Sequence, residues 1–166
     1  PGGPKISALA QTAREKGTDP GFKFPRPMIH SKDLNFSFSG LKTAVLYKIR
    51  SVGRDDEAFK EEIALAFEEA VMEVLVEKTR QALLSREEEV KTLIIAGGVA
   101  ASQHLRECFE ILIQEFPGLV LRTPTKALAT DNAIMIGLAS YMAVQKHPEL
   151  LSQQTTLKAN GNLSLT

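Results

Sequence analysis

The sequence predicts an α/β fold in which a short, mostly parallel sheet is flanked by helices. An apolar, β-branched run at 92–96 ends at Gly97 and Gly98, and a helical pattern follows these glycines. A second apolar run, at 119–121, follows that helix. The order strand, helix, strand is typical of a parallel crossover.

The composition is that of a globular protein, with 43% hydrophobic and 24% charged residues in a chain of 166. This length suits one domain or a piece of a larger protein. Because the chain carries 20 Lys+Arg and 20 Asp+Glu, its net charge is zero, and an RNA partner would be bound by a local patch or through other subunits. A single cysteine, Cys108, excludes an intrachain disulfide and favours the cytoplasm. No apolar run is long enough to span a membrane, and no signal peptide is evident.

Prolines dominate the first 35 residues. Residues 1–4, Pro-Gly-Gly-Pro, predict a fixed turn before a helix that ends near Lys16. Residues 17–35 hold three further prolines and predict a loop that is functional or covers a neighbouring element. A chain that begins inside a turn suggests a truncated or proteolysed protein.

Residues 36–40 alternate between aromatic and small residues, which predicts a short strand. Ser39 is then a candidate N-cap for a helix that runs to about Arg50. Ser39 and Lys42 also match the S-x-x-K pattern of serine hydrolases. The companion motifs of those enzymes are absent from this sequence, so we do not assign that activity.

The strongest helical pattern covers 55–85, where apolar residues recur at three- and four-residue spacing. Its many glutamates predict a solvated face rather than a metal site. The glutamates of this helix are Glu57, Glu61, Glu62, Glu68, Glu69, Glu73 and Glu77. Residues 86–90 read as a charged linker.

The turn at Gly97 and Gly98 is the candidate ligand site of the fold. In an open α/β sheet, ligands bind at the carboxyl ends of strands, and free N–H groups at a helix start favour an anion. An ordinary turn that uses glycine for its geometry alone is an equal alternative. The following helix has an apolar face from Leu105 to Phe116, beside which Cys108 is expected to be a core thiol.

Asp131 precedes a helix at 133–146 that is small and apolar almost all round, which predicts close burial against other elements. Asp131 is either the N-cap of this helix or a carboxylate that faces a ligand or metal. Residues 148–166 form a polar tail that we expect to be weakly ordered. The histidines His30, His104 and His147 lack metal-ligand spacing and are taken as structural or surface residues.

Five motifs in order resemble the C-terminal half of the tRNA N6-adenosine threonylcarbamoyltransferases, the TsaD family, long described as glycoprotein endopeptidases. The resemblance runs from residue 1 to about residue 146. The motifs are PGGP at 1–4, FPRP at 24–27, DLNFSFSGLKT at 33–43, AGGVAA at 96–101, and the segment 124–136 with its TDNA.

This resemblance implies a partial actin-like lobe of the sugar kinase and Hsp70 superfamily, with an active cleft between two lobes. It implies a transferase that moves threonylcarbamoyl from threonylcarbamoyl-AMP to N6 of adenosine 37 in tRNAs reading ANN codons. A divalent metal, iron or zinc, would orient the donor. Partner subunits of the tRNA threonylcarbamoylation complex are also implied.

The resemblance also assigns roles to residues. Asp131 matches the metal-binding aspartate, Gly3 a substrate-contacting glycine, and Gly97 with Gly98 the glycine turn on the nucleotide side of the cleft. Ser102 stands where the family usually has a ligand-contacting asparagine, and Ser7 where an acidic residue often contacts the ribose.

The family's metal-binding H-x-x-x-H motif is absent from this sequence. We therefore expect the chain alone to be inactive without the N-terminal half and to lack catalytic residues of its own. We also expect it to self-associate through exposed surface, or to be disordered near the N-terminus and in residues 17–35. The alternative functions are a non-catalytic paralogue that binds a nucleotide or a partner, and a glycoprotein endopeptidase.

Overall fold

The computed structural model describes residues 2–86 and 90–152. The chain forms two compact units, Pro1–Thr130 and Asp131–Thr166, and each is described by itself. The first unit combines helices with a two-stranded parallel sheet, so the predicted α/β class with a short parallel sheet is confirmed. None of the helices in the described part of the chain is long and apolar enough to cross a membrane.

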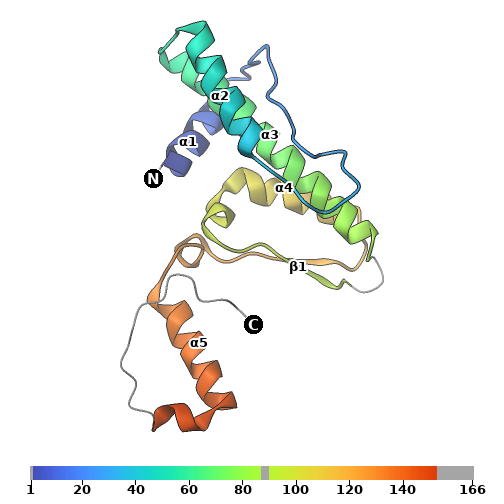
Figure 1. Ribbon diagram of the computed structural model, residues 1–166, viewed down its shortest axis with the longest axis vertical. Coiled ribbons are helices and arrows are strands. Elements are labelled where there is room, and N and C mark those ends of the chain that lie inside the picture. The colour runs from blue at the N-terminus through green and yellow to red at the C-terminus, as the bar shows by residue number, and fades with distance from the viewer. Residues whose placement is uncertain (1, 87–89, 153–166) are drawn as a thin grey trace. The chain divides into compact units, whose positions relative to one another are not determined.

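Helix α3, Glu57–Leu84, runs through the whole first unit (Figure 1). It begins at Asp56, whose side chain accepts a hydrogen bond from the Phe59 amide, and its bounds agree with the predicted helix at 55–85. Two hydrophobic cores form along it. The first core holds Phe24, Leu41, Phe59, Ile63, Ala66 and Ala70, and the second holds Met72, Leu83, Leu105, Phe109, Leu112 and Phe116.

Helix α1, Gly2–Glu15, packs against α3. The predicted turn at 1–4 is wrong, because Gly2, Gly3 and Pro4 already lie in the first helical turn. The first amides of a helix have no partner within the helix, so a proline there sacrifices no hydrogen bond.

Ion pairs hold α1 and the residue that follows it to α3. Arg14 binds Glu68 at 2.6 Å and Lys16 binds Glu61 at 2.7 Å. Both glutamates are buried, so the prediction of a fully solvated glutamate face is wrong at these two positions. Charged side chains are buried in this way only when they are paired.

Residues 17–35 form the predicted loop, but residues 36–40 are not a strand. Helix α2, Ser39–Val52, begins one residue after Phe38, so Ser39 is inside the helix and is not its N-cap. The aromatic alternation has another cause, since the rings of Phe36 and Phe38 contact each other with centroids 5.7 Å apart. Leu41 is the buried residue that joins α2 to the first core.

The sheet pairs β1, Thr92–Ile94, with β2, Val120–Arg122, in parallel register, with Leu93 opposite Leu121. Helix α4, Gln103–Ile113, connects the two strands and buries Leu105, Phe109 and Leu112 in the second core. The predicted strand, helix, strand order is confirmed. The predicted linker at 86–90 lies partly outside the described residues.

The second unit consists of helix α5, Ala133–Lys146, and a short 3₁₀ helix η3, Pro148–Leu151. The prediction of a closely buried α5 is wrong for the described chain, in which no residue of this helix is buried and Ile134 and Ile136 are 60% and 65% exposed. The described residues of this unit are too few to form a core around the helix. Most of the predicted tail, 153–166, lies outside the described residues.

Candidate functional site

The loops after β1 and β2 lie at the same edge of the sheet, because the two strands are parallel. The first loop runs from Ile95 to Ser102 and contains the glycine turn. The second covers 123–130 and includes the short 3₁₀ helix η2, Lys126–Leu128. The Ile95 amide donates to the Arg122 carbonyl at 3.0 Å, so the pairing continues up to the point where the loops begin. This edge is where parallel sheets bind ligands.

Gly97 adopts φ = +86°, a left-handed conformation that a residue with a Cβ rarely tolerates. The prediction that a helix follows the glycines directly is wrong, since a 3₁₀ helix η1, Gly98–Ala101, lies between Gly97 and α4. The carbonyls of Gly97 and Val99 accept bonds within this turn, while no described hydrogen bond uses the amides of Gly98 and Val99. The turn therefore presents amide donors and an open surface around both glycines.

Ser102 is the N-cap of α4. Its Oγ accepts a hydrogen bond from the Leu105 amide at 3.3 Å, which satisfies one of the first amides of the helix. The predicted ligand-contacting hydroxyl therefore already has an internal partner.

Arg106 joins the two loops, a role that the sequence analysis missed. Its Nε donates to the Ala100 carbonyl at 2.7 Å, and its Nη2 donates to the Pro124 carbonyl at 2.6 Å. A cation in the first turns of a helix is unfavourable for the helix dipole, and that placement is the sequence signal that could have identified it.

Gly3 and Ser7 lie on α1, which packs against α3, and no described hydrogen bond joins them to the glycine turn. A Cβ at Gly3 would meet no atom within 4 Å, so its surface is open. The Ser7 hydroxyl donates to Glu68 at 2.6 Å, and the other oxygen of Glu68 accepts from Arg14. Of the predicted site residues, the structure brings together Gly97, Gly98 and Ser102.

Asp131 is exposed and opens the second unit, so it is not placed relative to the glycine turn. It is not the N-cap of α5, because the Asn132 side chain accepts the Met135 amide at 3.1 Å. Among the described residues, no group of three or more His, Cys, Asp or Glu side chains is arranged to hold a metal ion. A single carboxylate does not fit a tightly bound metal, so we derive no step through one.

His104 and Cys108 lie on adjacent turns of α4, with the sulfur 3.6 Å from Nε2 of His104. Burial, helped by the nearby Arg14 charge, lowers the pKa of His104, and burial raises the pKa of the Cys108 thiol. Both groups therefore favour their neutral forms, as expected for a thiol at the edge of the second core rather than a nucleophile.

A sequence model of one family, TsaD, the tRNA N6-adenosine threonylcarbamoyltransferases, matches residues 1–138. A tRNA N6-adenosine threonylcarbamoyltransferase of Thermosipho africanus (strain TCF52B) is 42% identical over 165 residues, which cover 99% of this chain and 47% of the relative. The protein of that name from Verminephrobacter eiseniae (strain EF01-2) is 43% identical, over 87% of this chain and 40% of the relative. The one from Polaromonas sp. (strain JS666 / ATCC BAA-500) is 39% identical, over 100% of this chain and 46% of the relative. The chain thus spans less than half the length of these relatives. With a family match over most of its length, the chain belongs to the tRNA N6-adenosine threonylcarbamoyltransferase family.

Proposed function

We propose that this chain is the part of a tRNA-modifying transferase that holds the leaving nucleotide of its donor. The reaction joins the carbamoyl carbon of threonylcarbamoyl-AMP to N6 of adenosine 37 and breaks the bond between that carbon and the phosphate oxygen. It releases AMP, and the proton that N6 loses passes to solvent. We further propose that this chain belongs to an actin-like lobe, that the protein acts in the cytoplasm, and that partner subunits assist it. The observation that carries the proposal is the glycine turn with its free amides at the carboxyl edge of a parallel sheet.

Negative charge grows on the phosphate as AMP leaves. The amides of Gly98 and Val99 are suited to stabilise that charge, because no hydrogen bond among the described residues uses them. They can therefore donate to the phosphate without first breaking an internal bond. The positive φ of Gly97 sets the direction of the chain through this turn. Arg106 holds the turn against the loop after β2 through its bonds to the Ala100 and Pro124 carbonyls. The residues of this chain therefore bind and orient the donor, and we assign no proton transfer to them.

The test uses the complete gene product that contains this sequence, incubated with unmodified tRNA, threonylcarbamoyl-AMP and the partner subunits. The expected result is threonylcarbamoyladenosine at position 37, detected by mass spectrometry of digested tRNA. Absence of this product with intact donor and with the partner subunits present would overturn the proposal.

Two variants test the role of the loop. Arg106→Met removes both carbonyl contacts and is expected to raise KM for the donor about tenfold or more, because a displaced loop loses its alignment. Arg122→Met makes the same chemical change at an exposed side chain and should keep the wild-type KM. Equal values of KM for both variants would contradict the assigned role.

We propose that Asp131 supplies one ligand to a divalent metal, iron or zinc, whose other ligands come from outside this chain. Asp131→Ala should then lower the metal content of the complete protein, measured by elemental analysis after dialysis. Asp55→Ala, at another exposed aspartate, is the control. Equal metal content in wild type and Asp131→Ala would remove Asp131 from the site.

A second candidate function is a non-catalytic paralogue that binds a nucleotide or a partner. It is favoured by the internal partners of two serine hydroxyls: Ser7 donates to Glu68, and Ser102 Oγ accepts from the Leu105 amide as the N-cap of α4. In that case the complete gene product would bind AMP but yield no modified tRNA in the assay above.

A further inference from the structure

The neutral net charge of the chain hides a strongly basic segment. Residues 21–54 carry seven lysines and arginines and a single acidic residue, Asp33. The Asp33 carboxylate is itself occupied, since it accepts bonds from the Ser31 hydroxyl and the Asn35 amide. The segment comprises most of the loop before α2 and all of α2. The basic residues are Lys23, Arg26, Lys32, Lys42, Lys48, Arg50 and Arg54.

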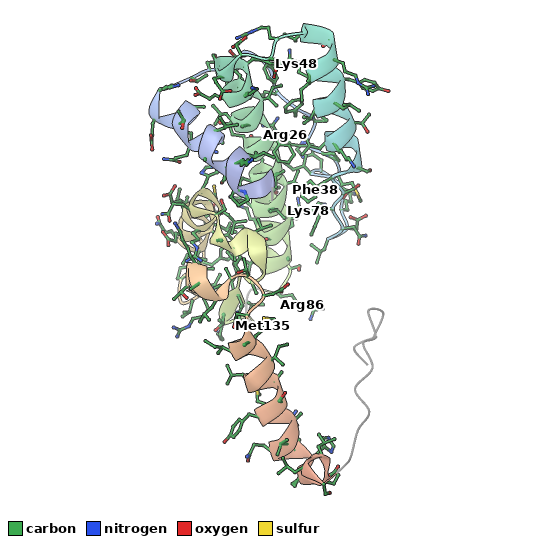
Figure 2. The ribbon with its side chains drawn as sticks, turned by 90° about the vertical axis from the view of Figure 1, so that its left-hand side faces the viewer. Arg26, Phe38, Lys48, Lys78, Arg86 and Met135 are labelled. Carbon is green, nitrogen blue, oxygen red and sulfur yellow. The ribbon has the colours of Figure 1, made fainter. Side chains whose placement is uncertain are left out.

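Several of these cations are used within the fold. Arg26 forms two hydrogen bonds with Glu73, and Arg54 forms two with Asp56. The Lys48 ammonium lies 4.1 Å from the centre of the Phe22 ring. In Figure 2, Lys48 lies in the later turns of α2 and Phe38 at its start. These residues stabilise the first core and its loop, and they leave Lys42 and Arg50 as the exposed cations of α2.

Lys42, Leu46 and Arg50 follow each other at four-residue spacing, so they line one face of α2 over about 12 Å. This face turns away from Leu41, the residue that α2 buries, by about 100° at Lys42 and about 180° at Arg50. Tyr47 lies beside the stripe and is 64% exposed, and α2 contains no acidic residue. For the described part of the chain, no ion pair or hydrogen bond occupies the Lys42 or Arg50 side chain. We call Lys42, Leu46, Tyr47 and Arg50, together with Phe36, the α2 surface.

Phe36 adds a second exposed aromatic ring at the N-terminal end of α2. Its ring is 52% exposed although it contacts Phe38, which packs against the first core. The loop before it is anchored, because the buried Lys78 ammonium binds the Ser31 and Asp33 carbonyls at 2.8 Å each. An exposed aromatic ring on a held loop is suited to stacking on an unpaired base.

We propose that the α2 surface binds RNA, with Lys42 and Arg50 on backbone phosphates and Tyr47 or Phe36 stacked on unpaired bases. Unpaired cations without competing carboxylates favour a polyanion, and exposed aromatic rings beside them favour single-stranded bases over a protein carboxylate patch. This inference rests on the proposed function, which supplies tRNA as the RNA. A folded tRNA offers both the paired backbone and the unpaired loop that the surface is suited to bind.

The test measures binding of a fluorescently labelled, unmodified tRNA to the complete protein by anisotropy, without donor, over a range of salt concentrations. Two lost phosphate contacts should weaken binding of Lys42→Ala/Arg50→Ala roughly 25- to 60-fold at 0.1 M salt and reduce the log–log salt slope by about 1.4–1.8. Lys5→Ala/Lys91→Ala removes two exposed cations outside α2 and should keep the wild-type slope. Equal slopes for the two double variants would overturn the inference.

Tyr47→Ala provides an independent signature of stacking. Loss of one stacked base should weaken binding about fivefold or more at every salt concentration, with no change in the salt slope. If both Tyr47→Ala and Phe36→Ala bind tRNA like the wild type, the aromatic part of the inference is wrong. A protein partner on the α2 surface would leave tRNA binding by Lys42→Ala/Arg50→Ala unchanged, which also overturns the inference.

These outcomes are separable from the proposed function. Salt-dependent tRNA binding through α2 without product would overturn the transferase activity and support the surface. Product formation by Lys42→Ala/Arg50→Ala with an unchanged KM for tRNA would overturn the surface and support the transferase.

Discussion

Lys78 offers the sharpest test of how the loop before α2 is held. Its side chain is 3% exposed, and its ammonium donates to the Ser31 carbonyl, the Ser31 hydroxyl and the Asp33 carbonyl at 2.7–2.8 Å. Lys78→Met keeps the apolar stem of the side chain and removes all three bonds. Figure 2 shows Lys78 on α3, from which it reaches this loop.

The expected loss can be worked from these contacts. A hydrogen bond to a charged group contributes about 1.5–3 kcal/mol, but the three bonds share one donor and their acceptors lie in a loop that water can reach once the ammonium is gone. We therefore expect Lys78→Met to lower the free energy of unfolding by about 2–3 kcal/mol. The loss should appear as a lower urea midpoint with an unchanged m-value.

The matched control is Lys60→Met, at a lysine of the same helix whose side chain is 41% exposed; its ion pairs with Asp55 and Glu57 are open to solvent, so the midpoint should stay close to the wild-type value. Amide hydrogen exchange in residues 28–35 should also quicken in Lys78→Met and stay unchanged in Lys60→Met. A loss below 1 kcal/mol, or an equal loss in both variants, would refute the reasoning.

Three further predictions concern the second core and the glycine turn. Leu112→Ala, in the second core, should cost about 2–5 kcal/mol in urea unfolding, whereas Ile111→Ala, at a side chain that is 64% exposed on the same helix, should cost much less; similar losses would contradict the packing. Gly97→Ala should cost about 1–2 kcal/mol because its φ is +86°, and Gly98→Ala, without a positive φ, should be nearly neutral; equal stability of the two would exclude backbone strain as the cause. Because burial lowers the pKa of His104, the unfolded chain binds the proton more readily and stability should fall as the pH drops through about 6.5, where unfolded histidines titrate. His104→Gln should remove part of that fall in urea midpoints measured between pH 5 and pH 7.5, and an identical pH profile would contradict it.

Sequence periodicity was sufficient to predict a helix or strand wherever one face of that element is buried within this chain. The long helix α3 and the crossover from β1 through α4 to β2 were predicted because their apolar residues recur at helical or strand spacing. The same signal explains why Cys108 was correctly assigned to the edge of a core.

Local patterns were misleading where another interaction decides the conformation. The Pro-Gly-Gly-Pro start reads as a turn, yet a first helical turn needs no amide from Pro4. The alternation at Phe36 and Phe38 reads as a strand, yet the segment directly before α2 is irregular and the two rings contact each other within it. In both cases the deciding feature lies within the same few residues, but the residue pattern alone does not reveal it.

The candidate site was predicted only in part. The position of the glycine turn followed from the strand before it, but its 3₁₀ geometry and the link through Arg106 depend on a loop that lies 18 residues further along the chain. The burial of Glu61 and Glu68 was missed for a similar reason, because their partners lie far away in the sequence: Arg14 on α1 pairs with Glu68, and Lys16, just after α1, pairs with Glu61.

Helix α3 also sets a length scale for the first unit. The α3 residues of the first core lie between Phe59 and Ala70 and those of the second between Met72 and Leu83, so the two groups are centred about 20 Å apart along the helix axis. The α2 surface lies on the helix that packs on the first core. The glycine turn leads into α4, which packs on the second core. Because α3 is an uninterrupted helix, this distance is fixed. A single nucleotide can therefore bind at the α2 surface or at the glycine turn, but only an extended ligand can contact both at once.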